Sequence, residues 1–178
     1  MEKFKNWTLF LDRDGVINEE RPNDYVKTTE EFVFIFGVLE ALKILNKHFE
    51  QIIIVTNQRG VGKEIMSKKT LEEIHQQMLN QIEKSGGRID KIYVCTDTES
   101  SSLNRKPNIG MALQAQKDFP NIVFKESILI GNSLSDMQFG KNLQMKTILV
   151  GEKYTDKEKD LSLIDFYYKD LLSFARSL

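Results

Sequence analysis

The sequence has little cysteine, little histidine and almost no net charge, and these shortages exclude several classes of protein. Its 178 residues include one cysteine, Cys95, so an internal disulfide is impossible. Two histidines and one cysteine cannot supply the four ligands of a structural zinc site. Lys and Arg number 25 against 26 Asp and Glu, and a formal charge of −1 argues against a dedicated nucleic-acid binder or a polybasic membrane anchor.

Long apolar runs are also lacking. The longest, Phe32 to Leu39, is far shorter than the ~20 residues of a membrane span. At the N-terminus, acidic residues come before an apolar signal-peptide region could form. We therefore expect a reduced, cytoplasmic protein without membrane contact. A hydrophobic content of 40% with 29% charged residues is ordinary for a globular protein, and the length predicts one domain over residues 1–178.

Short apolar runs alternate with amphipathic segments along the chain. The runs suit strands buried on both faces, and they cover residues 7–11, 51–56, 89–95, 127–130 and 146–150. Apolar residues at helical spacing predict four helices between these runs. One follows Gly37, one covers Leu71 to Ile82 with Thr70 as the expected cap, one starts near Pro107, and one follows Ser133. This alternation predicts an α/β fold with a doubly wound parallel sheet in three layers. The charged residues 152–160 are expected to form a solvated loop.

Polar residues suited to phosphate chemistry follow four of the predicted strands. In an open parallel sheet, ligands bind beyond the carboxyl ends of the strands. The segments at these ends are, in chain order, LDRDG (11–15), TNQ (56–58), RKP (105–107) and GNSLSD (131–136). Taken singly, each is also typical of a turn, a helix cap or a solvated loop. Their occurrence in this order at the strand ends favours one shared site.

This set of motifs resembles the haloacid dehalogenase (HAD) superfamily of aspartate-nucleophile phosphatases. The segments DRDGVIN, VTNQRG and RKPNIGM are similar to its histidinol-phosphate and heptose-bisphosphate phosphatase branch, and the similarity runs from about Thr8 to Val150. The length leaves no room for a large cap insertion. The resemblance therefore implies a Rossmann-like core without a cap domain, in which short loops select the substrate.

The resemblance implies a catalytic role for four residues. Asp12 would attack phosphorus to form an aspartyl-phosphate, and Asp14 would act as general acid and then as general base. Thr56 would hydrogen-bond the transferring phosphoryl group, and Lys106 would neutralise charge on its oxygens.

The resemblance also implies Mg²⁺, which prefers hard oxygen ligands. Asp12, the carbonyl of Asp14 and Asn132 would hold the ion, with Asp136 as a further acidic position. Asn132 departs from the superfamily pattern, which has Asp here, so one negative charge is missing beside the metal. Related heptose-bisphosphate phosphatases carry a Cys/His zinc loop before the third motif. The segment after Cys95 contains no further Cys or His before that motif, so no zinc is expected.

Eight further residues are expected to contact substrate because they lie in or beside the motifs. They are Arg13, Glu20, Arg21, Asn23, Asn57, Gln58, Arg59 and Arg105. Arg59 and Lys63, in the segment NQRGVGK, could meet a second phosphate or simply be solvated. His48 and His75 fall on predicted helices away from the motifs and are interpreted as ordinary surface or core residues.

Four hypotheses for the function follow. The first is a Mg²⁺-dependent phosphomonoesterase that removes the 7-phosphate of D-glycero-D-manno-heptose 1,7-bisphosphate and acts as a monomer on a small metabolite. Histidinol phosphate is an alternative substrate. A 3′-phosphatase of nucleic-acid ends shares the mechanism but would need a basic groove. A catalytically silent binding protein is favoured only by Asn132.

Overall fold

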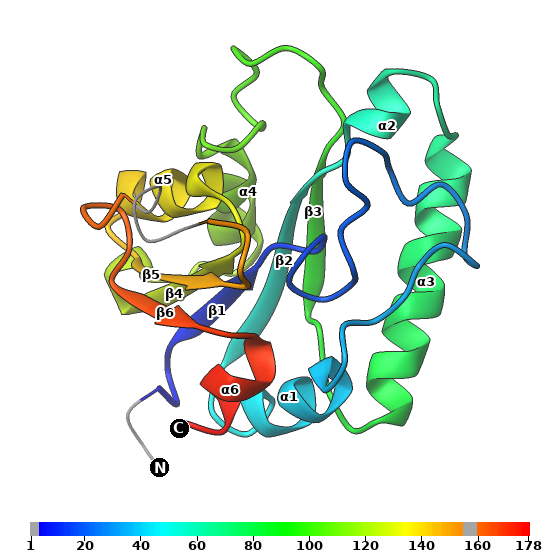
Figure 1. The fold of residues 1–178 in the computed structure, drawn as a ribbon. Helices are drawn as coiled ribbons and strands as arrows, with labels where there is room; N and C mark the ends of the chain where they lie inside the picture. Colours follow the sequence, from blue (N-terminus) through cyan, green and yellow to red (C-terminus); the bar gives the residue numbers. More distant parts are fainter. Residues whose placement is uncertain (1–3, 155–159) are drawn as a thin grey trace.

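A computed structural model describes residues 4–154 and 160–178, and a six-stranded parallel sheet forms its centre (Figure 1). The strand order is β3-β2-β1-β4-β5-β6, with every neighbouring pair parallel. The strands are β1 (Thr8–Leu11), β2 (Gln51–Asn57), β3 (Lys91–Cys95), β4 (Ser127–Gly131), β5 (Lys146–Val150) and β6 (Phe166–Tyr168). The fold is the doubly wound α/β architecture that the alternating pattern predicts.

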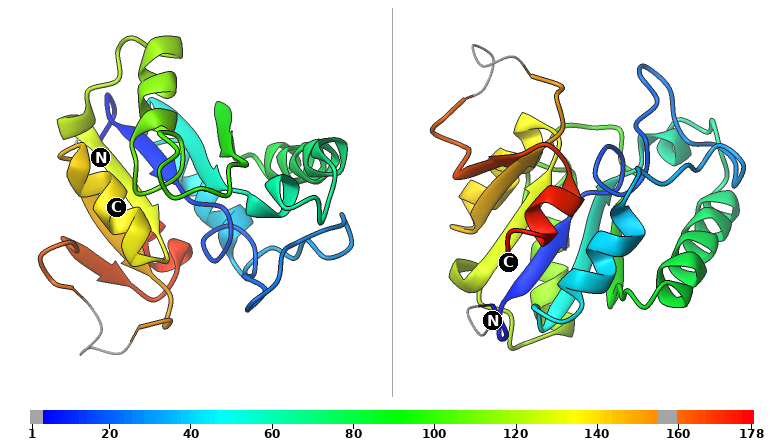
Figure 2. Two further views of the ribbon diagram at one scale, coloured as in Figure 1. Left: turned by 90° about the horizontal axis from the view of Figure 1, so that it is seen from above. Right: turned by 60° about the horizontal axis from the view of Figure 1, so that its bottom comes forward.

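Helices cover both faces of this sheet (Figures 1 and 2). They are α1 (Val38–Leu45), α2 (Arg59–Gly62), α3 (Lys68–Lys84), α4 (Gly110–Asp118), α5 (Leu134–Asn142) and α6 (Leu171–Ala175), with a 3₁₀ turn at Phe124–Glu126. Alternate strand residues divide the core between the faces, as a period of two requires. Leu9 and Ile52 pack with α1, α3 and α6, whereas Phe10 and Ile53 pack with α4 and α5.

Two local expectations were wrong, and one strand was not expected. Ser67, not Thr70, caps α3, and its side chain accepts the N–H of Thr70. Helix α4 begins at Gly110 rather than near Pro107. Strand β6 was not anticipated, because its three residues are too few for a periodic signal. The charged segment predicted as a solvated loop falls partly on residues 155–159, which lie outside the described residues.

The topology places the motif loops at one edge of the sheet. Strand β1 lies between β2 and β4, so the loops that follow these three strands leave the sheet side by side. Figure 1 shows the long loops after β1 and β3 rising from this edge. Because β1 and β4 lie at the centre and the chain changes direction between them, the edge beyond them is the expected ligand site of such a sheet.

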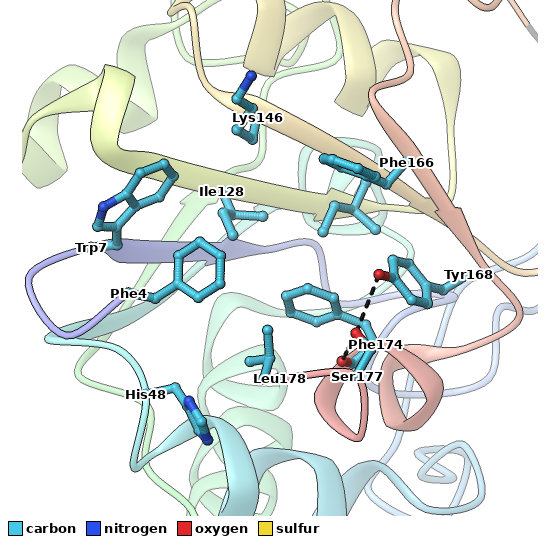
Figure 3. Close-up of a pocket in the computed structure, with 11 residues that line it drawn as sticks. Phe4, Trp7, His48, Ile128, Lys146, Phe166, Tyr168, Phe174, Ser177 and Leu178 are labelled. Carbon is cyan, nitrogen blue, oxygen red and sulfur yellow. Dashed lines mark hydrogen bonds between the residues drawn. The ribbon is translucent and has the colours of Figure 1, made fainter. Parts of the chain in front are cut away.

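Away from this edge, a cavity of about 470 Å³ lies between the N-terminal segment, strands β4 to β6 and α6 (Figure 3). Five of its eleven lining residues are Phe, Trp or Tyr, and Phe4, Trp7 and Phe174 point into it. It contains none of the motif residues. In the part of the chain that the structure describes, we find no helix long and apolar enough to cross a membrane.

Candidate active site

The four motif loops form one polar pocket of about 440 Å³ at the carboxyl edge of the sheet. Each motif supplies at least one lining residue: Asp12 and Asp14 after β1, Asn57 at the end of β2, Lys106 before α4, and the segment that opens α5. Polar atoms separated by more than 100 residues in the sequence therefore face one space. This arrangement is what the order of motifs along the chain indicates.

Lys106 lies at the centre of the charged groups, and its side chain is only 2% exposed. Its Nζ lies 2.9 Å from Asp12 Oδ1 and 2.6 Å from Asp136 Oδ1, and it donates a hydrogen bond of 2.8 Å to the carbonyl of Val55. Burial acts against the charged ammonium, but the two carboxylates keep the pKa of Lys106 above its ordinary value. The lysine thus stays charged and holds three segments of the chain together.

Asp12 sits directly after β1 with one carboxylate oxygen tied down. Its Oδ1 accepts hydrogen bonds from the backbone N–H of Arg13 at 2.8 Å and from Lys106. Burial and the nearby charges of Asp136 and Asp14 raise the pKa of Asp12 to about 7, against the lowering effect of Lys106. Three carboxylates thus lie close to one ammonium, and a further positive charge here would favour the ionised form of Asp12.

Asp14 is held by four side-chain donors. Its oxygens accept hydrogen bonds from Arg13 Nη2 at 2.8 Å, Asn18 Nδ2 at 2.9 Å and Gln58 Nε2 at 2.8 Å, with Arg13 Nε at 3.3 Å. Burial alone would raise the pKa of this carboxyl, but the charge of Arg13 and these hydrogen bonds hold it below its usual range. The carboxylate is thereby fixed in orientation on the pocket wall.

Asn132 is oriented by a carboxylate from the first loop. Its Nδ2 donates to Glu20 Oε2 at 3.0 Å, and Glu20 also binds Lys153 Nζ at 2.9 Å. Gly15 allows this contact: its φ is +80°, and a Cβ there would lie 1.8 Å from Asn132 Nδ2. The amide nitrogen is therefore engaged by Glu20, which leaves the amide oxygen as the group available to a cation.

The donor set fits Mg²⁺. Asp12, Asn132 and Asp136 all line the pocket, and each presents a hard oxygen of the kind that this ion prefers. The negative charges of Asp136 and Asp14 beside Asp12 favour a further cation here. Among the described residues, no three His, Cys, Asp or Glu side chains form a metal-binding group. The candidate ligands are accordingly a mixed set of carboxylate, amide and backbone oxygens.

The residues at the carboxyl end of β2 and directly after it mainly organise the site. Thr56 is fully buried, and its Oγ1 accepts a hydrogen bond of 2.9 Å from Gln58 Nε2. Asn57 accepts from the backbone N–H of Lys106 at 3.1 Å and donates to its carbonyl at 3.3 Å. Asn57 and Gln58 line the pocket, whereas Thr56 lies behind it.

Arg13, expected to contact substrate, is placed elsewhere. The residue is fully buried, lies outside the pocket lining and binds Asp14. His75 was interpreted as distant from the motifs, and that interpretation was wrong. Although it belongs to α3, its Nε2 lies 3.0 Å from Arg13 Nη1. The large separation in sequence explains why no local pattern indicated this contact.

The other predicted substrate contacts fall into two groups. Glu20, Arg21 and Asn23 line the pocket. Arg59 and Arg105 do not, but they neighbour each other: burial and the charge of Arg59 lower the pKa of Arg105.

Several pocket residues carried no signal that identified them from sequence. Lys153 belongs to the charged segment interpreted as solvated, yet it pairs with Glu20. Asp24 and Tyr25, which belong to none of the four motifs, also line the pocket. The loop after β3 is held by hydrogen bonds, including one from Ser102 to Asp97 and two from Asn108 Nδ2 to backbone carbonyls of that loop.

Comparisons with known proteins agree with this geometry. A family model described as "Polynucleotide kinase 3 phosphatase" matches residues 8–173. The D-glycero-alpha-D-manno-heptose-1,7-bisphosphate 7-phosphatase of Campylobacter jejuni is 37% identical over 173 residues, covering 97% of each chain. A D-glycero-beta-D-manno-heptose-1,7-bisphosphate 7-phosphatase of Helicobacter pylori is 35% identical over 147 residues, covering 82% of this chain and 83% of the relative.

A solved structure is similar over nearly the whole chain. The D,D-heptose 1,7-bisphosphate phosphatase of B. bronchiseptica, complexed with magnesium and phosphate, superposes with a TM-score of 0.87 at 26% identity. The match covers 96% of this chain and 97% of that one. With its motif loops gathered around Asp12 and Lys106, the chain belongs to the polynucleotide kinase 3 phosphatase family, within the HAD superfamily of phosphatases that its motifs resemble.

Proposed function

We propose that this protein is a Mg²⁺-dependent phosphatase that removes the 7-phosphate of D-glycero-D-manno-heptose 1,7-bisphosphate through an aspartyl-phosphate on Asp12. The observation that carries the proposal is the placement of Asp12, Asp14, Lys106 and Asp136 in one pocket. Relatives named for this activity, at 35–38% identity, support the choice of substrate. They include enzymes named for the alpha and for the beta anomer, so both anomers belong in the test.

In the first half-reaction, Asp12 is the nucleophile. Arg13 N–H and Lys106 hold its Oδ1, which leaves Oδ2 to attack phosphorus. As the bond from Oδ2 to phosphorus forms, the bond from phosphorus to the sugar oxygen breaks, and Asp14 gives its proton to that oxygen. The dianionic phosphate of the bound substrate adds negative charge beside Asp14, which raises its pKa toward the protonated form that this step needs.

In the second half-reaction, Asp14 reverses its role. It takes a proton from a water molecule whose oxygen attacks the phosphorus of the aspartyl-phosphate. The bond between Asp12 and phosphorus breaks, inorganic phosphate leaves, and Asp12 is again a carboxylate. Lys106 touches Asp12 and neutralises charge on the phosphoryl oxygens throughout.

Asp12, the carbonyl of Asp14, Asn132 and Asp136 are the residues we propose to hold Mg²⁺. When bound, the ion supplies a Lewis acid and positive charge for the phosphate oxygens. Glu20 accepts a hydrogen bond from the Asn132 amide nitrogen and so directs the amide oxygen of Asn132 toward the site, while its own charge is paired with Lys153. The presence of Asp12, Asp14 and Lys106 in the same pocket supports an active enzyme over the silent binding protein.

The second phosphate of the substrate needs a separate group of cations. Arg59 and Arg105 are neighbours, and Arg59 Nε is buried with no hydrogen-bond partner among the described residues. Lys63 lines the pocket with its Nζ 5.7 Å from the ring centre of Tyr25. We assign the second phosphate to the positive edge formed by Arg59, Lys63 and Arg105.

A small substrate fits this pocket better than a nucleic-acid end. Glu20 and Asp24 stand among its lining residues, and carboxylates there would repel a polynucleotide backbone. We further propose that the enzyme acts as a one-domain monomer in the cytoplasm. Its single, buried Cys95 suits a reducing compartment, and light scattering on the purified chain tests the monomer.

The test is phosphate release with and without Mg²⁺. The substrates are both heptose 1,7-bisphosphate anomers, heptose 7-phosphate, histidinol phosphate and a 3′-phosphorylated oligonucleotide. We expect a preference for the bisphosphate that requires Mg²⁺. Arg105→Ala should raise KM for the bisphosphate about tenfold and change KM for the monophosphate little, whereas Lys84→Ala, an exposed change on α3, should alter neither. A preference for histidinol phosphate or the oligonucleotide would refute the proposed substrate.

A further inference from the structure

His75 is a buried titratable residue that the catalytic steps above do not use. It lies on the inner face of α3 and is 8% exposed, among Leu71, Ile74 and Met78. Burying an imidazole in such surroundings is unfavourable unless its nitrogens find partners. Its Nε2 has one, Arg13 Nη1 at 3.0 Å.

The chemistry of Arg13 fixes how this contact works. A guanidinium has five N–H donors and no acceptor, so Arg13 donates and His75 Nε2 accepts. The imidazole is therefore neutral, with its proton on Nδ1. Burial and the positive charge of Arg13 lower the pKa of His75 to about 3, in agreement with a neutral ring.

The same guanidinium of Arg13 also binds the carboxylate of Asp14. Its Nη2 and Nε bind the Asp14 carboxylate at 2.8 and 3.3 Å, and the ring centre of Phe32 lies 6.0 Å from its Cζ. The guanidinium is held from three sides and has no exposed surface. Neither Arg13 nor His75 lines the pocket, whereas Asp14 does.

We propose that His75 is a positioning residue for Asp14, acting through Arg13. By accepting the Nη1 hydrogen bond, it fixes the plane of the guanidinium, and that plane fixes the Asp14 oxygens that exchange the proton with the leaving group. The inference rests on the acid–base role given to Asp14 in the proposed function. His75 touches neither the substrate nor the reacting atoms.

Leaving-group dependence separates this role from a merely structural one. A sugar alkoxide must be protonated as it leaves, whereas 4-nitrophenolate leaves readily as an anion. Misplacing Asp14 therefore slows the phosphorylation of Asp12 by alkyl phosphates and has little effect on its phosphorylation by aryl phosphates, a difference that appears in kcat/KM. Hydrolysis of the aspartyl-phosphate, in which Asp14 is the base, is common to all substrates. Loss of folded protein slows both equally.

The experiment uses His75→Leu, which removes the acceptor, and His75→Gln, whose side-chain oxygen can accept from Arg13. A series of phosphomonoesters from heptose 1,7-bisphosphate to 4-nitrophenyl phosphate is the substrate set. We expect His75→Leu to lower kcat/KM for the sugar phosphate about tenfold more than for the aryl phosphate, and His75→Gln to recover most of the loss. Met78→Ala, a buried change on the same helix, should affect all substrates alike.

Equal losses of kcat/KM across the series, which would leave the leaving-group dependence as in the wild type, would overturn the inference. An independent readout is the ¹⁵N NMR spectrum of the imidazoles in the wild-type chain, with His75→Gln as the assignment control. A neutral ring protonated at Nδ1 supports the contact, and a ring protonated at Nε2 contradicts it. If the wild type hydrolysed no phosphomonoester, the proposed function would fail, and the NMR result would still show whether the contact exists.

Discussion

Replacing Lys106 by Met tests the electrostatic centre of the site. The change keeps a long unbranched side chain but removes the ammonium that touches Asp12 Oδ1, Asp136 Oδ1 and the Val55 carbonyl at 2.9, 2.6 and 2.8 Å. Both carboxylates are then left buried without their cation. Removing one partner of a buried ion pair costs about 3–5 kcal/mol, because the other charge stays uncompensated.

Two features of the structure refine this magnitude. Asp12 has a pKa of about 7, so the protein can relieve part of the strain by protonating it near neutral pH. We therefore expect a loss near the lower end, about 3 kcal/mol. In a chain of this length, that corresponds to a fall in Tm of roughly 6–12 °C.

The assay is guanidinium chloride unfolding followed by circular dichroism, in EDTA at pH 7.5. Lys84→Met, on the exposed surface of α3, is the control and should change the free energy of unfolding by less than about 0.5 kcal/mol. The double variant Lys106→Met/Asp136→Asn also removes one of the two unpaired carboxylates, and it should recover about 1 kcal/mol of the lost free energy of unfolding. If Lys106→Met were as stable as the control, the three-way contact would not have the energetic role described here.

Three further predictions follow from the site. Asn132→Asp places a second carboxylate against Glu20, whose side chain is 42% exposed, so unfolding in EDTA should become easier by about 1 kcal/mol, and added Mg²⁺ should stabilise this variant more than the wild type. An equal Mg²⁺ effect on both would count against Asn132 as a ligand. Burial and Arg13 lower the pKa of His75 from 6.5 to about 3 in the folded chain. Between these two pH values the unfolded chain binds a proton on His75 that the folded chain does not bind. The contribution of His75 to stability is therefore lost as the pH falls below 6.5. The free-energy difference between wild type and His75→Gln should therefore fall by up to about 1.4 kcal/mol per pH unit between pH 6 and pH 4, and a constant difference would contradict the buried neutral ring. Gly15→Ala should lower the free energy of unfolding by about 1–3 kcal/mol more than Gly151→Ala does. Both glycines have positive φ, but of the two only Gly15 lacks room for a Cβ, which would lie 1.8 Å from Asn132 Nδ2. Equal unfolding midpoints for the two variants would contradict this clash.

The sequence patterns predicted the sheet and its edge well, because a parallel strand buried on both faces leaves a continuous apolar run. The runs 51–56 and 146–150 correspond closely to β2 and β5. Strand β6 left no such record, since it has three residues and two of them are exposed. Its place depends on pairing with β5, a contact between distant segments that local periodicity does not report.

For the site, the four motifs indicated the correct edge of the sheet because strand topology brings successive loops together. Sequence could not indicate which way each side chain turns. Arg13 stands between Asp12 and Asp14 yet points into the core toward His75, a partner on α3. Lys153 follows β5 in a charged run, and only its contact with Glu20 from the first loop distinguishes it from solvated neighbours. In both cases, the deciding partner lies on another element.

Chemical trapping of the intermediate tests the central claim, that Asp12 is the nucleophile of a Mg²⁺-dependent phosphatase. The full chain would be mixed with heptose 1,7-bisphosphate and Mg²⁺, quenched, reduced with borohydride and mapped by peptide mass spectrometry. Reduction converts a phosphorylated aspartate to homoserine. We predict homoserine at position 12, dependent on both Mg²⁺ and substrate, and absent from Asp12→Asn. Phosphate release without modification of Asp12, or with modification at another carboxylate, would contradict the account.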